Sequence, residues 1–351
     1  MADAIAQARF GFDADALQAY LHDELGAASG PVGVREFSGG ASNPTYLVLA
    51  GGEQWVMRSK PNGPLAPGAH AIHREFRVLR ALHNTGYPVP QPLAYCDDAG
   101  RIGQEFYLME YMPGEIFIDY RLPDQSRADR FAIYDALNAN LARLHTLDPE
   151  ALGLGDYGKP GNYFERQLKL WRRQYEEQSV RMPEFEALAG WIEDNMLVEN
   201  QRALTHGDFT LLNMIFEPGT PRLLAVLDWE LSTIGHPLAD LAYTLLHWYM
   251  PTTRAALGYY TLDGVDARAL GIPTLEEFVD TYQERTGFRF SRRDLNFAIA
   301  FNNFRNAGIG FGNIHRAAIG TAKNDLSESC RGIIMPSIEA AWRYARLADA
   351  A

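Results

Sequence analysis

The sequence predicts an α+β protein with two lobes, a small β-rich lobe over residues 1–112 and a larger helical lobe over residues 113–351. Strand-length apolar runs separated by Gly and Pro turns fill most of the first third of the chain, whereas apolar residues at helical spacing fill most of the remainder. A Met-Pro-Gly segment at 112–114 separates the two patterns. A chain of 351 residues is long enough to build two hydrophobic cores.

The first lobe is predicted to contain five strands and two helices. A helical stripe begins near Asp13 and stops at Gly26, and we expect this helix to lie on the first lobe. The second helix is expected over residues 71–82. Apolar runs between Gly, Pro and Asn turns predict strands over residues 32–37, 45–50, 54–59, 93–96 and 105–111.

The second lobe is predicted to be helical with one embedded hairpin. The apolar runs 214–216 and 223–227 flank a turn that contains Pro218, Gly219 and Pro221, which is typical of a β-hairpin. Apolar residues at helical spacing predict helices over residues 127–147, 162–178, 182–200, 237–249, 275–285, 292–306 and 334–347. The stretch 292–306 is apolar on all sides, so we expect it to be buried.

The composition argues against several classes of protein. There are 32 basic and 44 acidic residues, for a formal net charge of −12, which disfavours a general role in binding nucleic acid or membrane surfaces. Cys96 and Cys330 are too few for a disulfide framework and fit a reducing compartment. Because the chain shows no secretory signal and no apolar run of membrane-spanning length, we expect a cytoplasmic protein.

Two acids and an amide are expected to converge at the mouth of the hairpin. Asp208 and Asn213 precede its first strand, and Asp228 follows its second strand. Antiparallel pairing brings these two ends together, although 20 residues separate the acids. Carboxylate and amide oxygens are suitable ligands for Mg²⁺ beside nucleotide phosphates, and a separate carboxylate can accept the proton of a hydroxyl group. The pattern therefore indicates phosphoryl transfer.

These residues resemble a known family. His206-Gly207-Asp208, Asn213 and Asp228-Trp229-Glu230 are similar to the motifs of aminoglycoside phosphotransferase-like kinases, which include choline and homoserine kinases. The spacing from Asp208 to Asn213 is also that of the protein-kinase catalytic loop, with Gly207 in place of Arg. The resemblance covers nearly the whole chain and looks closest to the branch associated with acyl-CoA dehydrogenases.

The resemblance implies a bilobal protein-kinase-like fold and ATP-dependent transfer of phosphate to a small-molecule hydroxyl. It implies that Asp208 is the catalytic base, that Asn213 and Asp228 hold Mg²⁺, and that Asp240 braces the catalytic loop. Nucleotide contacts are expected from a glycine loop, a strand cation, a helix acid and the backbone between the lobes, namely Gly39, Gly40, Ser42, Asn43, Arg58, Glu75, Glu110 and Met112.

Two of these assignments have alternatives. Arg58 and Lys60 share one face of a predicted strand, so either could hold the phosphates, and strand register favours Arg58. Glu75 is the expected partner of that cation, or else a surface residue paired with Arg74 or Arg77.

The acceptor is expected to be anionic or linked as an acyl thioester. Residues 159–181 carry six basic against three acidic residues, and residues 285–331 carry eight against three. Candidate acceptor contacts are Tyr163, Arg166, Glu230 and Arg305, although Arg305 could instead belong to an internal network with nearby carboxylates.

The alternative to an enzyme is a nucleotide-binding or scaffold protein with weak catalysis. A protein kinase is disfavoured, because a helix is expected to resume soon after Glu230 and leaves no room for an activation segment.

Overall fold

The computed structural model describes residues 12–26, 31–37, 43–61, 71–177, 181–198, 201–253, 255, 258–318 and 327–351. The chain divides into two compact units. The first contains Met1–Gly114 together with Leu224–Glu230, and the second contains Glu115–Leu223 and Leu231–Ala351. The sequence had assigned residues 224–230 to the helical lobe, whereas the structure groups them with the β-rich unit.

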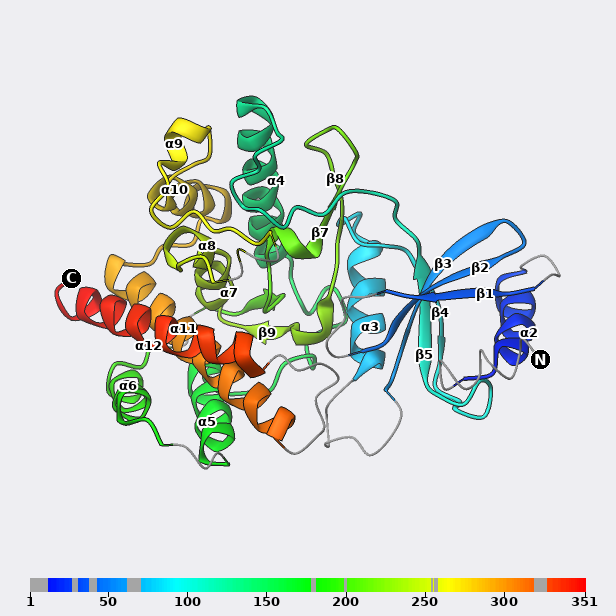
Figure 1. Ribbon diagram of the computed structural model, residues 1–351, viewed down its shortest axis with the longest axis horizontal. Helices are drawn as coiled ribbons and strands as arrows, with labels where there is room; N and C mark the ends of the chain where they lie inside the picture. The colour runs from blue at the N-terminus through cyan, green and yellow to red at the C-terminus, as the bar shows by residue number, and fades with distance from the viewer. Residues whose placement is uncertain are drawn as a thin grey trace. The chain divides into compact units, whose positions relative to one another are not determined.

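The first unit is built on a five-stranded antiparallel sheet with the order β1-β2-β3-β5-β4 (Figure 1). Its strands are β1 (Gly33–Glu36), β2 (Thr45–Ala50), β3 (Glu53–Ser59), β4 (Pro92–Cys96) and β5 (Phe106–Glu110), and its helices are α2 (Ala14–Leu25) and α3 (Ile72–His83). All seven predicted elements are present, and their ends agree with the prediction to within one residue.

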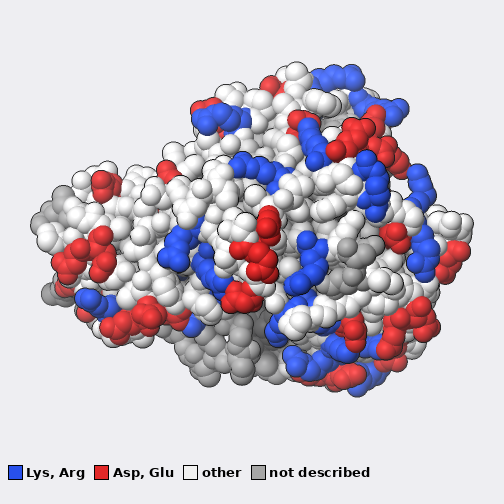
Figure 2. All heavy atoms as spheres, turned by 180° about the vertical axis from the view of Figure 1, so that it is seen from behind, with Lys and Arg blue, Asp and Glu red and all other residues white. Residues whose placement is uncertain are grey.

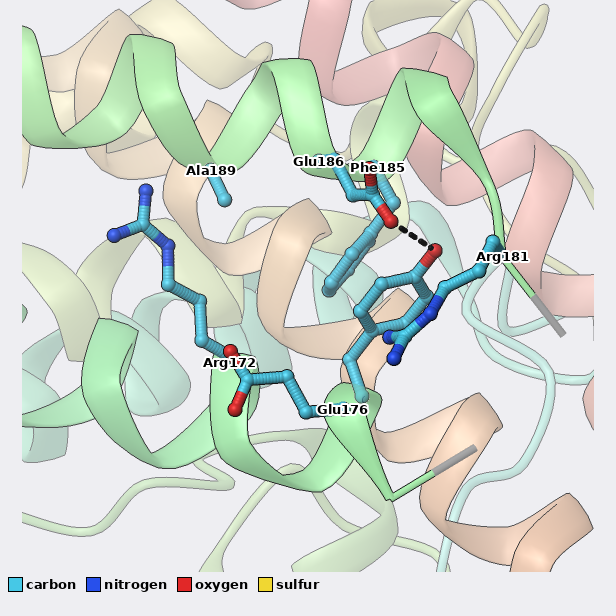
Figure 3. A pocket seen from close by; sticks show the side chains of 7 residues that line it. Arg172, Glu176, Arg181, Phe185, Glu186 and Ala189 are labelled. Carbon is cyan, nitrogen blue, oxygen red and sulfur yellow. Dashed lines mark hydrogen bonds between the residues drawn. The ribbon is translucent and has the colours of Figure 1, made fainter. Parts of the chain in front are cut away.

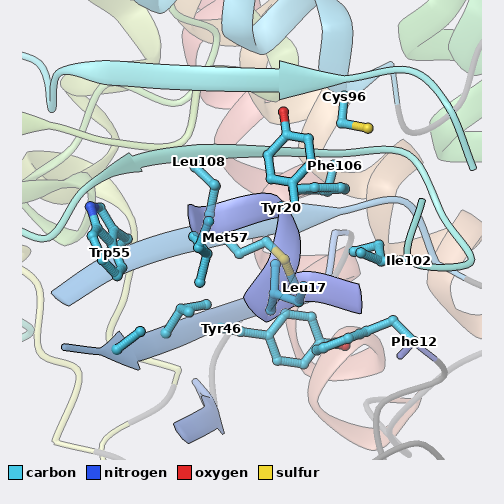
Figure 4. Close-up of a cluster of buried hydrophobic side chains, with 13 residues drawn as sticks. Phe12, Leu17, Tyr20, Tyr46, Trp55, Met57, Cys96, Ile102, Phe106 and Leu108 are labelled. Carbon is cyan, nitrogen blue, oxygen red and sulfur yellow. The ribbon is translucent and has the colours of Figure 1, made fainter. Parts of the chain in front are cut away.

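The two faces of this sheet have different roles. One face packs against α2 and forms an apolar core in which Leu17 and Tyr20 contact Met57 and Phe106 and their neighbours (Figure 4). On β3 the side chains alternate between faces, so that Arg58 lies on the opposite face from Met57. Arg58 is the register partner of Tyr107 on β5, and Phe76 of α3 packs against Tyr107 with the ring centroids 5.9 Å apart. The face covered by α3 therefore carries the cation predicted from the sequence.

The second unit is mainly helical. Its helices are α4 (Arg127–Thr146), α5 (Tyr163–Glu176), α6 (Pro183–Asp194), α7 (Pro237–Thr244), α8 (Leu246–Tyr249), α9 (Ala267–Leu270), α10 (Leu275–Thr286), α11 (Arg292–Ala318) and α12 (Ser327–Asp349). Helices α11 and α12 lie side by side (Figure 1). Phe297, Phe301 and Phe304 of α11 are fully buried, which confirms the prediction of a buried helix.

Short strands frame the segment that carries Asp208. Strand β6 (Ala203–Thr205) pairs antiparallel with β9 (Thr233–Gly235), with Thr205 opposite Thr233. Strands β7 (Met214–Phe216) and β8 (Leu223–Val226) form the predicted hairpin. Strands β6 and β9 were not predicted, because no Pro/Gly hairpin turn joins them, unlike β7 and β8.

Four predicted helices differ markedly from the structure, and one of them, expected over 334–347, begins earlier at Ser327 of α12. The helix expected over 237–249 is divided between α7 and α8, and the Thr244 hydroxyl at the division donates back to the Asp240 carbonyl, an interaction that tends to bend helices. The helix expected over 292–306 continues to Ala318 through Gly308 and Gly310. A Cβ atom on Gly308 would lie 3.0 Å from the Trp171 ring, so close packing between α11 and α5 explains this glycine. The helix expected over 182–200 ends at Asp194.

In the part of the chain that the structure describes, no helix is long and apolar enough to cross a membrane. Figure 2 shows Lys and Arg side chains interspersed with Asp and Glu over one face of the molecule, without a broad area of one sign.

Candidate active site

The loop after β6 carries the predicted base, and a glycine allows its close approach to the neighbouring chain. Gly207 has φ of 86°, in the left-handed region that glycine adopts most readily. A Cβ atom at this position would lie 2.9 Å from Leu231 Cβ and 3.0 Å from the Leu231 carbonyl oxygen. Both the backbone angle and the close approach therefore explain why glycine stands where protein kinases carry Arg.

Asp240 holds this loop from the first turn of α7. Its carboxylate accepts the backbone N–H of His206 at 2.7 Å and that of Gly207 at 2.8 Å, and it lies 3.2 Å from Nε2 of His145. Burial acts to raise the pKa of Asp240, but hydrogen bonding and charge interaction with His145 and His206 outweigh burial and hold that pKa below its ordinary value. The ionised carboxylate thus forms the brace that the family resemblance implied.

Asn213 orients the predicted base. It ends the short 3₁₀ helix Leu211–Asn213, and its Nδ2 donates to the Asp208 carbonyl oxygen at 2.9 Å and to Asp208 Oδ2 at 3.0 Å. Because the amide nitrogen faces Asp208, the Oδ1 atom of Asn213 is the end of the side chain left to bind a cation. This arrangement suits a base and a metal ligand that act side by side.

Two side chains that sequence reasoning did not select also lie at this loop. The carboxylate of Asp208 interacts with Tyr243 through its charge and a side-chain hydrogen bond, and these effects add to burial in raising the pKa of Tyr243. The Thr244 hydroxyl donates to the Phe209 carbonyl at 2.8 Å. Both residues lie in the last turn of α7, one turn after Asp240.

Arg305 has a different partner from those considered from the sequence. It is 6% exposed, and its Nη2 donates to the Gly207 carbonyl at 2.8 Å rather than to a carboxylate. Its guanidinium carbon lies 4.8 Å from the centroid of the Tyr243 ring. This placement favours a role in holding the loop over direct contact with the acceptor.

The other two acceptor candidates of the second unit lie at the start of α5. Tyr163 is buried, which raises its pKa, while the nearby charges of Arg305 and Arg166 act in the opposite direction. Arg166 is partly exposed, and its Nη1 donates to the carbonyl oxygens of Pro160 and Gly161.

A cavity of about 570 Å³ lies farther along α5, between that helix and α6 (Figure 3). Its polar side chains are largely paired: the Tyr175 hydroxyl donates to Glu186 at 3.2 Å, and Arg172 contacts Glu193 at 2.7 Å. It contains none of the candidate acceptor residues.

In the first unit, Arg58 lies among three carboxylates. Its Nε is 3.2 Å from Glu75, its Nη1 is 3.2 Å from Asp228 and its Nη2 is 3.4 Å from Glu230, although the Nε contact lacks hydrogen-bond geometry. Burial acts to lower the pKa of Arg58, but Tyr107 and the carboxylates raise it above its ordinary value. One guanidinium thus lies against three carboxylates.

Glu75 is tied to this cluster by further hydrogen bonds. It is 2% exposed and accepts from Asn43 at 2.7 Å and from the Tyr107 hydroxyl at 3.0 Å. Burial raises its pKa, and Arg58 opposes that shift. The alternative of Glu75 as a surface residue is therefore wrong, and the predicted pair of Arg58 and Glu75 is present.

Asp228 and Lys60 complete the first unit's site. Asp228 has φ of 64°, in the left-handed region that Asp tolerates better than most residues, and its side chain is 35% exposed. Lys60 pairs with Glu105 instead of Glu75. Among the described residues, no three His, Cys, Asp or Glu side chains are grouped to hold a metal, so the predicted ligands remain one amide and one carboxylate.

The remaining nucleotide candidates are only partly described. Gly39, Gly40 and Ser42 lie outside the described residues. At the end of β5, the Glu110 N–H donates to the Gln91 carbonyl at 2.9 Å, so this N–H is already bonded within the protein. Met112 follows outside the strand.

A model of the phosphotransferase enzyme family matches residues 33–278. The chain belongs to this family of phosphotransferases. A presumed aminoglycoside phosphotransferase from Ralstonia eutropha JMP134 is 39% identical, with 96% of this chain and 99% of that chain covered and a TM-score of 0.83. The predicted α+β fold of the aminoglycoside phosphotransferases is thereby confirmed.

Two other proteins resemble the chain to different degrees, the second of them in fold alone. Acyl-CoA dehydrogenase family member 11 of Gallus gallus is 40% identical over 334 residues, which cover 93% of this chain and 43% of that protein. The phosphotransferase therefore spans less than half the length of that relative. A spectinomycin phosphotransferase in complex with ADP and spectinomycin is 10% identical, with 95% of this chain and 98% of that chain covered and a TM-score of 0.57.

Replacing Arg58 with Ala in the phosphotransferase should raise the Michaelis constant for ATP and slow turnover, while Lys60→Ala should do neither. We expect a loss of roughly 10- to 100-fold in kcat/KM for ATP, because hydrogen bonds that involve a charged group contribute about 1.5–3 kcal/mol. Steady-state kinetics with varied ATP provides the measurement. If Lys60→Ala is the defective variant, Lys60 and not Arg58 holds the phosphates.

His236 should make the stability of the phosphotransferase depend on pH. Its Nδ1 accepts the Leu238 N–H at 3.2 Å and so caps α7, which only the unprotonated nitrogen can do. Burial lowers the pKa of His236 to about 4, and His145 adds to that effect while Asp294 opposes it. The unfolded chain binds a proton near pH ~6.5, so this contribution is complete above that pH and decreases as the pH falls toward 4.

We expect His236 to account for a loss of about 2 kcal/mol in the free energy of unfolding between pH 7 and pH 5. The Asn side chain of His236→Asn can cap a helix but does not titrate. Between pH 7 and pH 5, the free energy of unfolding of this variant should therefore fall by about 2 kcal/mol less than that of the wild type. Denaturant unfolding of both proteins at the two pH values tests this. Equal losses in both proteins would show that His236 does not titrate in this way.

Proposed function

We propose that this phosphotransferase transfers the γ-phosphate of ATP to a hydroxyl group of a small molecule. The observation that supports this best is the pairing of Asn213 with Asp208. It holds the Asp208 carboxylate, as the proton acceptor of this proposal, beside the Oδ1 atom of Asn213, which would bind a cation. A base and a metal ligand five residues apart on one loop are what phosphoryl transfer to a hydroxyl requires.

In this proposal, Asp208 accepts the proton of the acceptor hydroxyl as the oxygen attacks the γ-phosphorus. Asn213 and Asp228 would hold Mg²⁺, which supplies charge neutralisation at the phosphates when it is bound. Two protein ligands are sufficient, since Mg²⁺ keeps several waters and takes phosphate oxygens as further ligands.

Arg58 is proposed to bind the α- and β-phosphates. Its Nε faces Glu75, which orients the guanidinium, while Nη1 and Nη2 face Asp228 and Glu230. Arginine presents these donors as a planar fork that matches phosphate oxygens. Adenine is proposed to lie against the carbonyl of Glu110 and the N–H of Met112.

The acceptor is proposed to be anionic or an acyl thioester. Support comes from the curated relative, which is named an acyl-CoA dehydrogenase family member, and from Arg166 and Tyr163 at the start of α5. Glu230 contacts Arg58 and so belongs more naturally with the phosphate site than with the acceptor.

Two measurements test the proposed function. Calorimetry of ATP binding with and without magnesium should show binding that depends on magnesium. Incubation with magnesium-ATP and pooled hydroxyl compounds should then produce a phosphorylated product detected by its mass. Binding without any product would favour a nucleotide-binding protein with little catalysis, and efficient phosphorylation of kanamycin-like cations would contradict an anionic acceptor.

A further inference from the structure

The backbone around Asp208 is held by side chains from two helices. Asp240 of α7 accepts the N–H groups of His206 and Gly207, and Arg305 of α11 donates to the Gly207 carbonyl at 2.8 Å. Both polar groups of Gly207 are therefore occupied by buried charged side chains of opposite sign. The peptide planes on the two sides of Gly207 are fixed independently.

Helix α7 and the loop itself hold the residues that follow Gly207. The Thr244 hydroxyl of α7 donates to the Phe209 carbonyl at 2.8 Å, and within the loop the Asp208 N–H donates to Nδ1 of His206 at 3.2 Å. Every residue from 206 to 209 thus has at least one backbone group bonded to a side chain. We refer to Asp240, Thr244 and Arg305 as the loop clamp.

A clamp is physically necessary at this point. Glycine has more backbone freedom than any other residue, and a φ of 86° at Gly207 is only one of several conformations open to it. The ψ angle of Gly207 determines where the Asp208 carboxylate lies. Because catalytic groups must be held within about 0.5 Å of the productive geometry, the loop needs bonds that exclude the other conformations.

Arg305 is itself fixed in place. It is 6% exposed, and its guanidinium carbon lies 4.8 Å from the ring centroid of Tyr243. A cation over an aromatic ring is attracted to its face, and a flat guanidinium stacked there has little rotational freedom. The donor that holds Gly207 is therefore rigid, unlike an exposed arginine that is available to a ligand.

We propose that Arg305 and Thr244 are positioning residues that hold Asp208 in its catalytic geometry through the backbone of residues 207–209. The role of Asp208 as base rests on the proposed function, whereas the rigidity of the loop does not. Arg305 then acts on turnover through Gly207 and does not bind the acceptor directly.

The first test is amide hydrogen exchange of the peptide that contains residues 206–209. In Arg305→Met, its exchange should be about 10-fold faster or more, because a bond from a charged donor to a buried carbonyl is lost. Thr244→Val, which keeps the side-chain shape, should show a smaller increase. Arg343→Met is the matched control, since Arg343 also donates to a carbonyl, that of Tyr249, and stacks on a tyrosine ring away from the loop.

The second test separates positioning from binding of the acceptor. Once the screen has provided an acceptor, Arg305→Met should lower kcat and leave both Michaelis constants nearly unchanged, with Arg305→Lys partly restoring kcat. A raised Michaelis constant for the acceptor with normal kcat would overturn the proposal. So would unchanged exchange of residues 206–209 in both Arg305→Met and Arg305→Lys. If the wild type transfers no phosphate, the proposed function fails, while the exchange experiment still decides whether the clamp exists.

Discussion

Replacing Asp208 with Asn should lower turnover by about 10²- to 10⁴-fold, the usual contribution of a positioned base, and leave ATP binding intact. Asn has nearly the same shape as Asp but cannot accept the hydroxyl proton as a carboxylate does. Steady-state turnover with the identified acceptor and calorimetry with magnesium-ATP provide the two measurements.

Asp135→Asn is a suitable control for this variant. Asp135 is a carboxylate of the same unit that pairs with Arg285 at 2.7 Å, and it has no contact with the catalytic loop. Its turnover should match that of the wild type. Near-normal turnover in Asp208→Asn would show that another group accepts the proton.

Replacing Asp228 with Ala should weaken magnesium-dependent ATP binding by ~10-fold or more. Removing a residue that only hydrogen-bonds to a metal ligand typically lowers metal affinity by about 10- to 100-fold. Asp228 is proposed to be a direct, charged ligand, so its removal should lower that affinity at least as much. Binding without magnesium should be no weaker than in the wild type, because Arg58 then faces one carboxylate fewer. Calorimetry with and without magnesium separates these two effects.

Comparing Glu230→Gln with Asp228→Ala shows which of the two acids binds magnesium. Glu230 lies 3.4 Å from the same guanidinium as Asp228, so the two acids share one cation but differ in their predicted roles. Glu230→Gln should retain most of the magnesium dependence. If Glu230→Gln loses that dependence and Asp228→Ala keeps it, the metal ligand has been wrongly assigned.

Local sequence patterns were sufficient for most of the fold. The strand positions, the helix over residues 71–82 and the hairpin follow from periodicity and turn residues, which act over a few neighbours. The helix from Arg292 to Ala318 was underestimated because its glycines lower helix propensity, and the contact of Gly308 with Trp171 could not be known in advance. Tertiary packing overrode local preference there.

The choice between Arg58 and Lys60 required the structure. The two residues are two positions apart on a strand and point to the same face, so the sequence alone does not distinguish them strongly. Glu75 decides between them, because it comes from a helix whose register against the sheet depends on side-chain packing.

The residues that hold Asp208 were missed for a similar reason. Tyr243, Thr244 and His145 appear in the sequence as ordinary members of helical patterns, and nothing in their spacing marks them. Arg305 was noticed as a cation in an apolar helix, but its partner is a backbone carbonyl of the loop, which sequence patterns do not reveal. The available signal was a polar side chain among apolar residues of a helix. This signal correctly indicated that Arg305 is buried and needs a hydrogen-bond partner, but it did not identify that partner.

The most direct test of the central claim is transfer of label from γ-labelled ATP to a small molecule in the presence of magnesium. The wild type and Asp208→Asn would be incubated with the same pool of hydroxyl compounds, and the labelled products would be separated from inorganic phosphate. The account predicts a labelled small molecule with the wild type and little or none with Asp208→Asn. Equal labelling by the two proteins, or magnesium-ATP binding without any labelled acceptor, would contradict it.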